Sequence, residues 1–186
     1  ASAWGLKDQI RYFANNGNGS FEDKTVEAGL VGITSGINLI HADYDNDGLV
    51  DIFVLRGGWI EKGGHYPNSL LRNLGDGRFA DVTQEAGLLS MHPTQTAAWA
   101  DFDRDGLLDL FIGNETWPDD GRHACELYRN NGNGTFTECA MSCGIHVTGI
   151  VKGVTVGDYD NDQWSDIYIS RFNEENIRVT GKGNKS

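Results

Sequence analysis

The sequence predicts an all-β fold, a β-propeller-like array of about three four-stranded antiparallel blades. Three observations support this: 25 glycines against 3 prolines in 186 residues, an internal repeat, and short segments rich in β-branched and aromatic residues. Glycine supplies the positive φ that tight hairpin turns need, so the composition favours short strands over long helices. A β-sandwich array is the alternative that this strand pattern leaves open.

Three markers repeat together along the chain. The acidic stretches DYDNDGLVD, DFDRDGLLD and DYDNDQWSD begin at residues 43, 101 and 158, so the step is 58 and then 57 residues. The glycine turns NNGNGSFED, NLGDGRFAD and NNGNGTFTE, and the segments EAGL, EAGL and SCGI, keep nearly the same step. We therefore predict one repeat array. Its units cover residues 10–67, 68–124 and 125–175, and residues 176–186 resemble the start of a partial fourth unit.

Each unit is predicted to hold four strands. The first strand runs into the acidic loop, as in NLIHADYD, and the second leaves it, as in DIFVL. The third and fourth, such as SLLRN and RFADV, flank a Gly-x-Gly turn and form a hairpin. KTVEAGL and VTQEAGL are each expected to form a single helical turn ended by Gly29 or Gly87.

The acidic loops predict calcium sites. Carboxylates about 4 Å apart repel one another by roughly 4 kcal/mol at an intermediate dielectric, and a divalent cation reverses that sign. Calcium accepts six to eight oxygens in a flexible geometry, whereas magnesium prefers a stricter octahedron. In each loop we assign four aspartate side chains and one backbone carbonyl as ligands. These are Asp43, Asp45, Asp47, Asp51 and the Leu49 carbonyl; Asp101, Asp103, Asp105, Asp109 and the Leu107 carbonyl; and Asp158, Asp160, Asp162, Asp166 and the Trp164 carbonyl.

Two alternatives to this assignment are less consistent with the sequence. An EF-hand needs helical flanks and a carboxylate at its twelfth position, where this chain has Val54, Ile112 and Ile169. Plain turns would also be rich in Asp, Asn and Gly, but three loops in register argue against that. The third loop carries Gln163 where the others have glycine, at a position expected to need positive φ. We therefore expect two strong calcium sites and a third, weaker one.

The charge of the chain limits its partners. Acidic residues outnumber basic ones 27 to 15, which disfavours nucleic acid and anionic membranes. No apolar run approaches the roughly 20 residues that span a bilayer, so no membrane insertion is expected. The sequence contains no Ser/His/Asp arrangement, phosphate-binding glycine loop or separated carboxylate pair. We therefore predict no catalytic residues, and a metal-dependent hydrolase is the least favoured interpretation.

Two Trp–His pairs occupy equivalent connections, Trp59 with His65 and Trp117 with His123. They are candidates for a ligand surface or a transition-metal site, although two histidines without a third ligand make a weak metal site. The alternative, which we favour, is a repeated packing element, because tryptophan mostly supplies buried area.

The cysteines are Cys125, Cys139 and Cys143. If the glycine hairpin centres on Gly132, Cys125 and Cys139 face each other across neighbouring strands, and a disulfide is feasible only if their Cα atoms lie about 4.4–6.8 Å apart. We prefer this bridge to one between Cys139 and Cys143. Reduced core thiols are the alternative.

The combination of DYDNDGLVDIF or DFDRDGLLDLF with LLRNLGDGRFADVTQEAGL or LYRNNGNGTF resembles FG-GAP or VCBS repeats. It is most similar to the repeats of secreted proteins of the cartilage acidic protein and ASPIC/UnbV type. The resemblance implies a β-propeller with integrin-α-like calcium loops in an extracellular or cell-surface protein. Such propellers usually have about seven blades.

Two functions follow as expectations. The first is a calcium-binding extracellular module for adhesion or ligand recognition, with a protein or a carbohydrate as its surface ligand. The second is a self-assembling repeat protein that binds copies of itself through open blade edges, forming a ring or a fibre.

Overall fold

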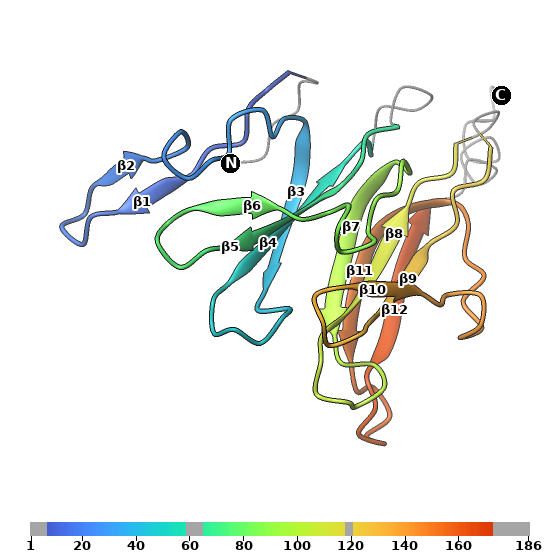
Figure 1. Cartoon of the computed structure of the whole chain (residues 1–186). Coiled ribbons are helices and arrows are strands. Elements are labelled where there is room, and N and C mark those ends of the chain that lie inside the picture. The colour runs from blue at the N-terminus through green and yellow to red at the C-terminus, as the bar shows by residue number, and fades with distance from the viewer. Residues whose placement is uncertain (1–6, 59–64, 118–120, 173–186) are drawn as a thin grey trace, which may run out of the picture.

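The computed structural model describes residues 7–58, 65–117 and 121–172, and within these ranges it contains strands and no helix (Figure 1). The strands are β1 (Phe13–Asn15), β2 (Phe21–Asp23), β3 (Gly36–Ala42), β4 (Asp51–Arg56), β5 (Ser69–Asn73), β6 (Phe79–Asp81), β7 (Thr94–Ala100), β8 (Asp109–Asn114), β9 (Glu126–Asn130), β10 (Phe136–Glu138), β11 (Ile150–Gly157) and β12 (Asp166–Phe172). The predicted all-β fold is confirmed.

The strands form antiparallel, propeller-like blades. Two sheets are complete, with the orders β3-β4-β5-β6 and β7-β8-β9-β10, and the pairs β1-β2 and β11-β12 lie on either side of them. Each complete sheet takes its first two strands from around one acidic loop and its last two from the glycine hairpin that follows. A blade therefore begins inside one predicted sequence unit and ends inside the next. The predicted partial unit at residues 176–186 lies outside the described residues.

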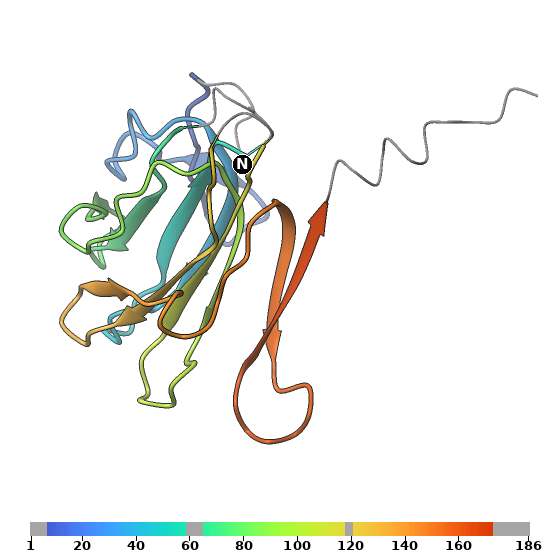
Figure 2. The same ribbon diagram turned by 90° about the vertical axis from the view of Figure 1, so that its right-hand side faces the viewer.

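The hydrophobic core lies between neighbouring sheets rather than inside any one of them (Figures 1 and 2). Every residue of β8 is buried, because this strand has a sheet on each of its faces. The largest cluster joins the two complete blades and includes Tyr44, Phe53 and Leu110, with Trp99 packed against it. Tyr44 stacks on Trp99 with ring centroids 6.3 Å apart.

The EAGL segments form the predicted single turns and connect successive blades. The Ala28 amide donates to the Lys24 carbonyl at 2.8 Å, and Gly29 ends the turn with φ of 74°. The Ala28 carbonyl then accepts the Phe79 amide of β6 at 2.9 Å. Ala86 and Phe136 repeat this contact one blade later, also at 2.9 Å. Each EAGL turn thus docks on the glycine hairpin of the next unit. This contact explains why the EAGL segments and the glycine hairpins repeat at the same spacing along the chain.

Candidate metal centre

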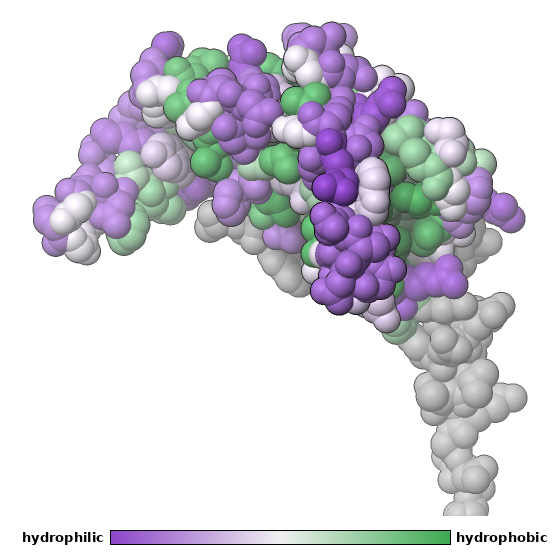
Figure 3. All heavy atoms as spheres, turned by 90° about the horizontal axis from the view of Figure 1, so that it is seen from below, coloured by the Kyte–Doolittle hydropathy of each residue, from purple (hydrophilic) through white to green (hydrophobic). Residues whose placement is uncertain are grey.

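The three acidic loops lie side by side at one end of the strands, at the bottom of Figure 1. Each loop joins two paired strands, and the closing pairs are Ala42 with Asp51, Ala100 with Asp109, and Gly157 with Asp166. Seen from this end, hydrophilic residues cover much of the surface, with apolar patches between them (Figure 3). Neighbouring loops also touch, because the Arg104 guanidinium lies 5.2 Å from the centre of the Trp164 ring.

In every loop, three of the four predicted aspartates converge. One oxygen from each lies within 4.8 Å of the other two. The three groups are Asp43, Asp45 and Asp51; Asp101, Asp103 and Asp109; and Asp158, Asp160 and Asp166. A spacing of this kind places several carboxylate oxygens around one point, as a calcium ion requires.

The remaining predicted aspartate shapes the loop instead of joining the close group. The Asp47 carboxylate accepts the Leu49 amide at 2.8 Å. Asp105 accepts the Leu107 amide at 2.9 Å, and Asp162 accepts the Trp164 amide at 2.8 Å. The first aspartate of each loop also holds the backbone, since Asp43 accepts the amides of Asp47 and Gly48, both at 3.0 Å. Coordination by Asp47, Asp105, Asp162 and the three carbonyls therefore stays a prediction.

The last aspartate of the first two loops is buried, which the sequence pattern did not indicate. Asp51 is 1% exposed and accepts the amides of Tyr44 at 3.3 Å and Asn73 at 2.8 Å. Burial raises the pKa of Asp51 to about 6 against the lowering effect of these hydrogen bonds, and the charges of Asp45 and Asp47 raise it further. Asp109 is 2% exposed, and burial likewise raises its pKa.

One oxygen of the first cluster is well suited to a cation. Among the described residues, the buried Oδ1 of Asp45 has no hydrogen-bond partner. A buried carboxylate oxygen without a partner carries a desolvation cost, which a bound cation would remove. Burial also raises the pKa of Asp45, and the neighbouring Asp47 carboxylate adds to the effect. The residues of the first loop therefore fit calcium on their own geometry.

The third loop has the same backbone but a different environment. Gln163 has φ of 75°, close to the 86° of Gly48 and the 88° of Gly106, so this position does require positive φ. Asp158, Asp160 and Asp166 are all exposed. Asp166 accepts the Tyr159 amide at 2.9 Å. In the first loop, Asp51 accepts a second amide from Asn73 of the following hairpin. In the described residues no hairpin follows β12 to donate an equivalent amide to Asp166.

The predicted Trp–His residues separate into two groups. The Trp117 indole donates to the buried Glu115 carboxylate at 3.1 Å, and Lys152 also binds Glu115 at 2.5 Å. Trp117 thus has a packing and hydrogen-bonding role between blades. The His65 and His123 rings lie 5.1 Å apart, and Trp59 is outside the described residues.

The predicted disulfide is absent, and the register explains why. Phe136 pairs with Asn130 and Glu138 with Tyr128, so the hairpin centres on residue 133 rather than on Gly132. The Cys139 amide consequently binds the Leu127 carbonyl at 2.7 Å, and Cys125 is two residues away from the facing position. The assignment of a Cys125–Cys139 bridge was wrong: all three cysteines are free thiols. Burial raises the pKa of Cys139 to about 12.

Across the part of the chain that the structure describes, no helix is long and apolar enough to cross a membrane.

Comparison with known proteins identifies the repeat. The chain matches the FG-GAP-like repeat three times, over residues 2–54, 43–112 and 116–169. It is 32% identical to cartilage acidic protein 1 of Xenopus tropicalis over 148 residues, which cover 78% of this chain and 21% of that protein. It is also 32% identical to the Homo sapiens protein and 30% identical to the Mus musculus protein, over 155 residues that cover 82% of this chain and 22% of either relative. The chain spans about a fifth of the length of these relatives. It belongs to the family of FG-GAP-like repeat proteins.

Proposed function

We propose that this chain is a calcium-binding, non-catalytic module that acts outside the cell in adhesion or ligand recognition. The observation that carries the proposal is the convergence of three aspartates in each of three equivalent loops. Such loops suit the millimolar calcium of extracellular fluid better than the scarce cytosolic ion. Calcium would be held by the three converging carboxylates in each loop, and it would remove the repulsion between them.

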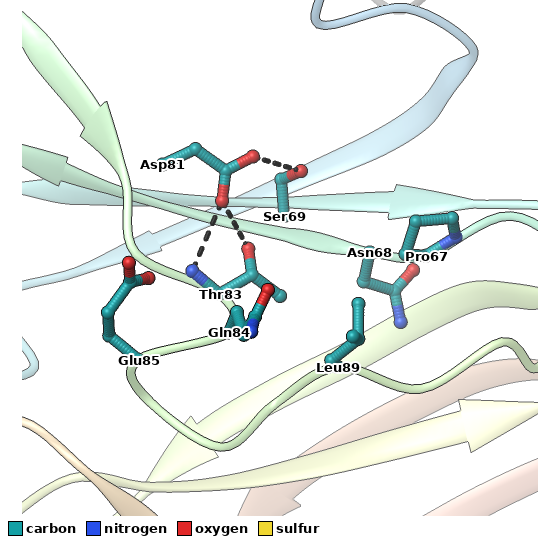
Figure 4. A pocket seen from close by; sticks show the side chains of 8 residues that line it. All are labelled: Pro67, Asn68, Ser69, Asp81, Thr83, Gln84, Glu85 and Leu89. Atoms are coloured by element: carbon teal, nitrogen blue, oxygen red, sulfur yellow. Dashed lines mark hydrogen bonds between the residues drawn. The ribbon is translucent and has the colours of Figure 1, made fainter.

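The polar pocket at the start of β5 and the end of β6 is built on a repeated turn element (Figure 4). Its Asp81 carboxylate accepts the Ser69 hydroxyl at 2.9 Å and the Thr83 amide at 3.1 Å. Asp23 makes the same contact with the Thr25 amide at 3.0 Å one unit earlier. The Asp-x-Thr arrangement therefore recurs as a turn element, which is consistent with the structural role that we propose for it.

Calcium titration tests the proposal. We expect calorimetry to detect two strong sites and one weaker site, and we expect thermal unfolding to shift upward with calcium. Magnesium at the same concentration is the matched control, because it dehydrates reluctantly and demands stricter geometry. A chain that binds neither ion, or that binds both equally, would contradict the assignment.

A second function, self-association, is favoured by the outer face of the β11-β12 pair. Tyr168 on β12 is 68% exposed, and Tyr159 and Phe172 are also exposed, whereas β8 in the equivalent position is buried. We propose that another sheet covers this face, because an exposed apolar sheet face promotes association. Light scattering in calcium and after chelation tests this second function: a defined oligomer or fibre supports it, and a monomer under both conditions rejects it.

A further inference from the structure

The strand pairs at the two ends of the array are complementary halves of one blade. The pair β11-β12 corresponds to the first two strands of a complete blade, because it encloses an acidic loop as β3-β4 and β7-β8 do. The pair β1-β2 corresponds to the last two strands. Asn15 pairs with Phe21 across its glycine turn, and Asn73 pairs with Phe79 in the same way between β5 and β6. The two pairs lie at opposite ends of the array and form separate sheets (Figure 1).

We propose that the β1-β2 hairpin of a second copy pairs with the edge of β12 and completes the third blade. The proposal rests on the self-association proposed above and names the surfaces that meet. An edge strand accepts another strand in this way through its unpaired backbone groups. The next blade of the second copy, β3-β4-β5-β6, would then cover the exposed outer face of the β11-β12 pair.

A pocket beside the third blade has the shape that the tip of this hairpin requires. Its volume is about 500 Å³, and its apolar lining includes Phe102, Leu127, Cys143 and Ile145. One unit earlier, the corresponding residues pack around Phe136 in the largest core cluster: they are Tyr44, Leu70, Ala86 and Leu88. The pocket therefore continues the interface that joins the two complete blades, and it lacks the aromatic ring that fills that interface.

The hairpin tip of β1-β2 carries such a ring. Phe136 of β10 is 7% exposed, its ring lies 5.7 Å from the Tyr44 ring, and its amide donates to the Ala86 carbonyl at 2.9 Å. Phe21 of β2 holds the same place in its hairpin but is 63% exposed. We therefore expect Phe21 of the second copy to enter the pocket and its amide to bind the Cys143 carbonyl.

Phe13 on β1 shows the same contrast. By hairpin register it corresponds to Leu71 on β5 and Tyr128 on β9. Both of these are buried where they pair with the strand that leaves the acidic loop. Phe13 is exposed. Pairing with β12 would place it opposite Ile167 and remove its apolar surface from water, which favours association.

The joint would also complete the third acidic loop. In the first two loops, the last aspartate accepts one amide at Oδ2 from its own loop and another at Oδ1 from the next hairpin, donated by Asn73 or Asn130. Asp166 accepts the Tyr159 amide at Oδ2. Asn15 holds the place of those asparagines on β1. The third calcium site is therefore incomplete until a second copy brings this amide to Asp166.

Assembly through this joint predicts a defined size. Each copy contributes two complete blades and two halves, so two copies joined at both ends form a ring of six blades. Closed propellers typically hold four to eight blades. We therefore expect a dimer with two equivalent head-to-tail joints.

Light scattering in saturating calcium tests the joint. We expect a dimer for the parent chain. Phe21→Ala removes the inserted ring and Cys143→Arg blocks the pocket, so each should raise the dissociation constant of the dimer at least about 100-fold. Both side chains are exposed in the single chain, so both variants should fold. The matched control is Leu89→Ala, which alters an exposed side chain between two blades that are already complete and should leave the dimer intact.

An equimolar mixture of Phe21→Ala and Cys143→Arg tests the head-to-tail direction. The mixture retains one intact joint, between the hairpin of one variant and the pocket of the other, so a heterodimer should form. A mixture that stays monomeric would contradict this direction. In the monomeric Phe21→Ala variant, the third loop should bind calcium about tenfold more weakly than in the dimer, because it lacks the second amide.

The possible results separate this joint from self-association in general. A parent chain that is monomeric with and without calcium would reject both. An oligomer that Phe21→Ala and Cys143→Arg leave intact would reject the joint alone. A chain that dimerises only after residues 173–186 are removed would assign the edge of β12 to the chain's own end, and would also overturn the proposal.

Discussion

The first two acidic loops and the third differ in environment more than in sequence. All three hold a triad of aspartates within 4.8 Å and turn through positive φ at the sixth position. In the first two, the next hairpin of the same blade buries the last aspartate and donates an amide to it from Asn73 or Asn130. The last aspartate of the third loop, Asp166, is exposed.

The difference shows that a metal loop of this kind has two parts. The loop itself places the aspartates, through its internal hydrogen bonds. The neighbouring hairpin dehydrates the site and restrains it: Leu49 and Leu107 lie against the turns at Gly75 and Gly132, where an added Cβ would meet the leucine side chain at 3.3 and 3.2 Å. A restrained, partly buried site should bind calcium more tightly than an exposed one.

Removal of calcium should have the largest effect. A site saturated at 100 times its dissociation constant stabilises the folded state by about 2.7 kcal/mol, so two strong sites contribute about 5 kcal/mol. For a domain of this size, we expect chelation to lower the melting temperature by about 10–20 °C. Calorimetric scans with and without a chelator measure the shift. A change below about 2 °C would mean that the first two loops are not strong calcium sites.

Variants with one aspartate replaced should show how much each loop contributes to calcium binding and to stability. In calcium, Asp45→Asn and Asp103→Asn should each lose one ion and about 2–3 kcal/mol of unfolding free energy, whereas Asp160→Asn should lose less than about 1 kcal/mol. In chelator the sign should reverse for Asp45→Asn, because the variant removes repulsion around a buried carboxylate. Denaturant unfolding under both conditions measures these values. Equal losses at all three sites would contradict the ranking.

Exchanging glycine and glutamine at the sixth position of an acidic loop should show how far backbone strain weakens the third site. A non-glycine residue at positive φ costs about 1 kcal/mol or more, so Gln163→Gly should tighten the third site by about fivefold if the exposed loop relaxes when it is empty. Gly106→Gln is the matched reverse change, and nothing lies within 4 Å of the added Cβ there. It should weaken the second site by a similar factor. Calcium titrations that show no change in either variant would exclude backbone strain as a cause.

A dependence on pH should be the smallest effect near neutrality. The pKa of Asp51 is raised to about 6 from an ordinary value of 3.8, so protons compete with calcium at the first loop as pH falls through about 6. Affinity there should fall by up to about tenfold for each further unit of pH. The calcium-free protein should show the opposite trend and gain stability over the same range, since protonation relieves the buried charge. Calcium affinity that is constant from about pH 7 to pH 5 would contradict this.

The sequence alone was enough to predict the strands, the repeat and the acidic loops, although it assigned four aspartates to each loop and only three of them converge. These features are local: strand propensity, turn glycines and alternating aspartates act within a few residues, and the repeat shows each of them three times. The need for positive φ at Gln163 could be predicted in the same way, by comparison with Gly48 and Gly106.

Only the tertiary structure decided which side chains meet across the blades. The hairpin centre lies one residue beyond Gly132, so Cys139 faces Leu127 and Cys125 is two residues away, which made the predicted bridge wrong. The burial of Asp51 and Asp109, and the meeting of His92 with His123, depend on elements far along the chain. Their positions follow from how one sheet packs on the next. Packing between sheets leaves no periodic signal in the residues themselves, and so it could not be predicted from them.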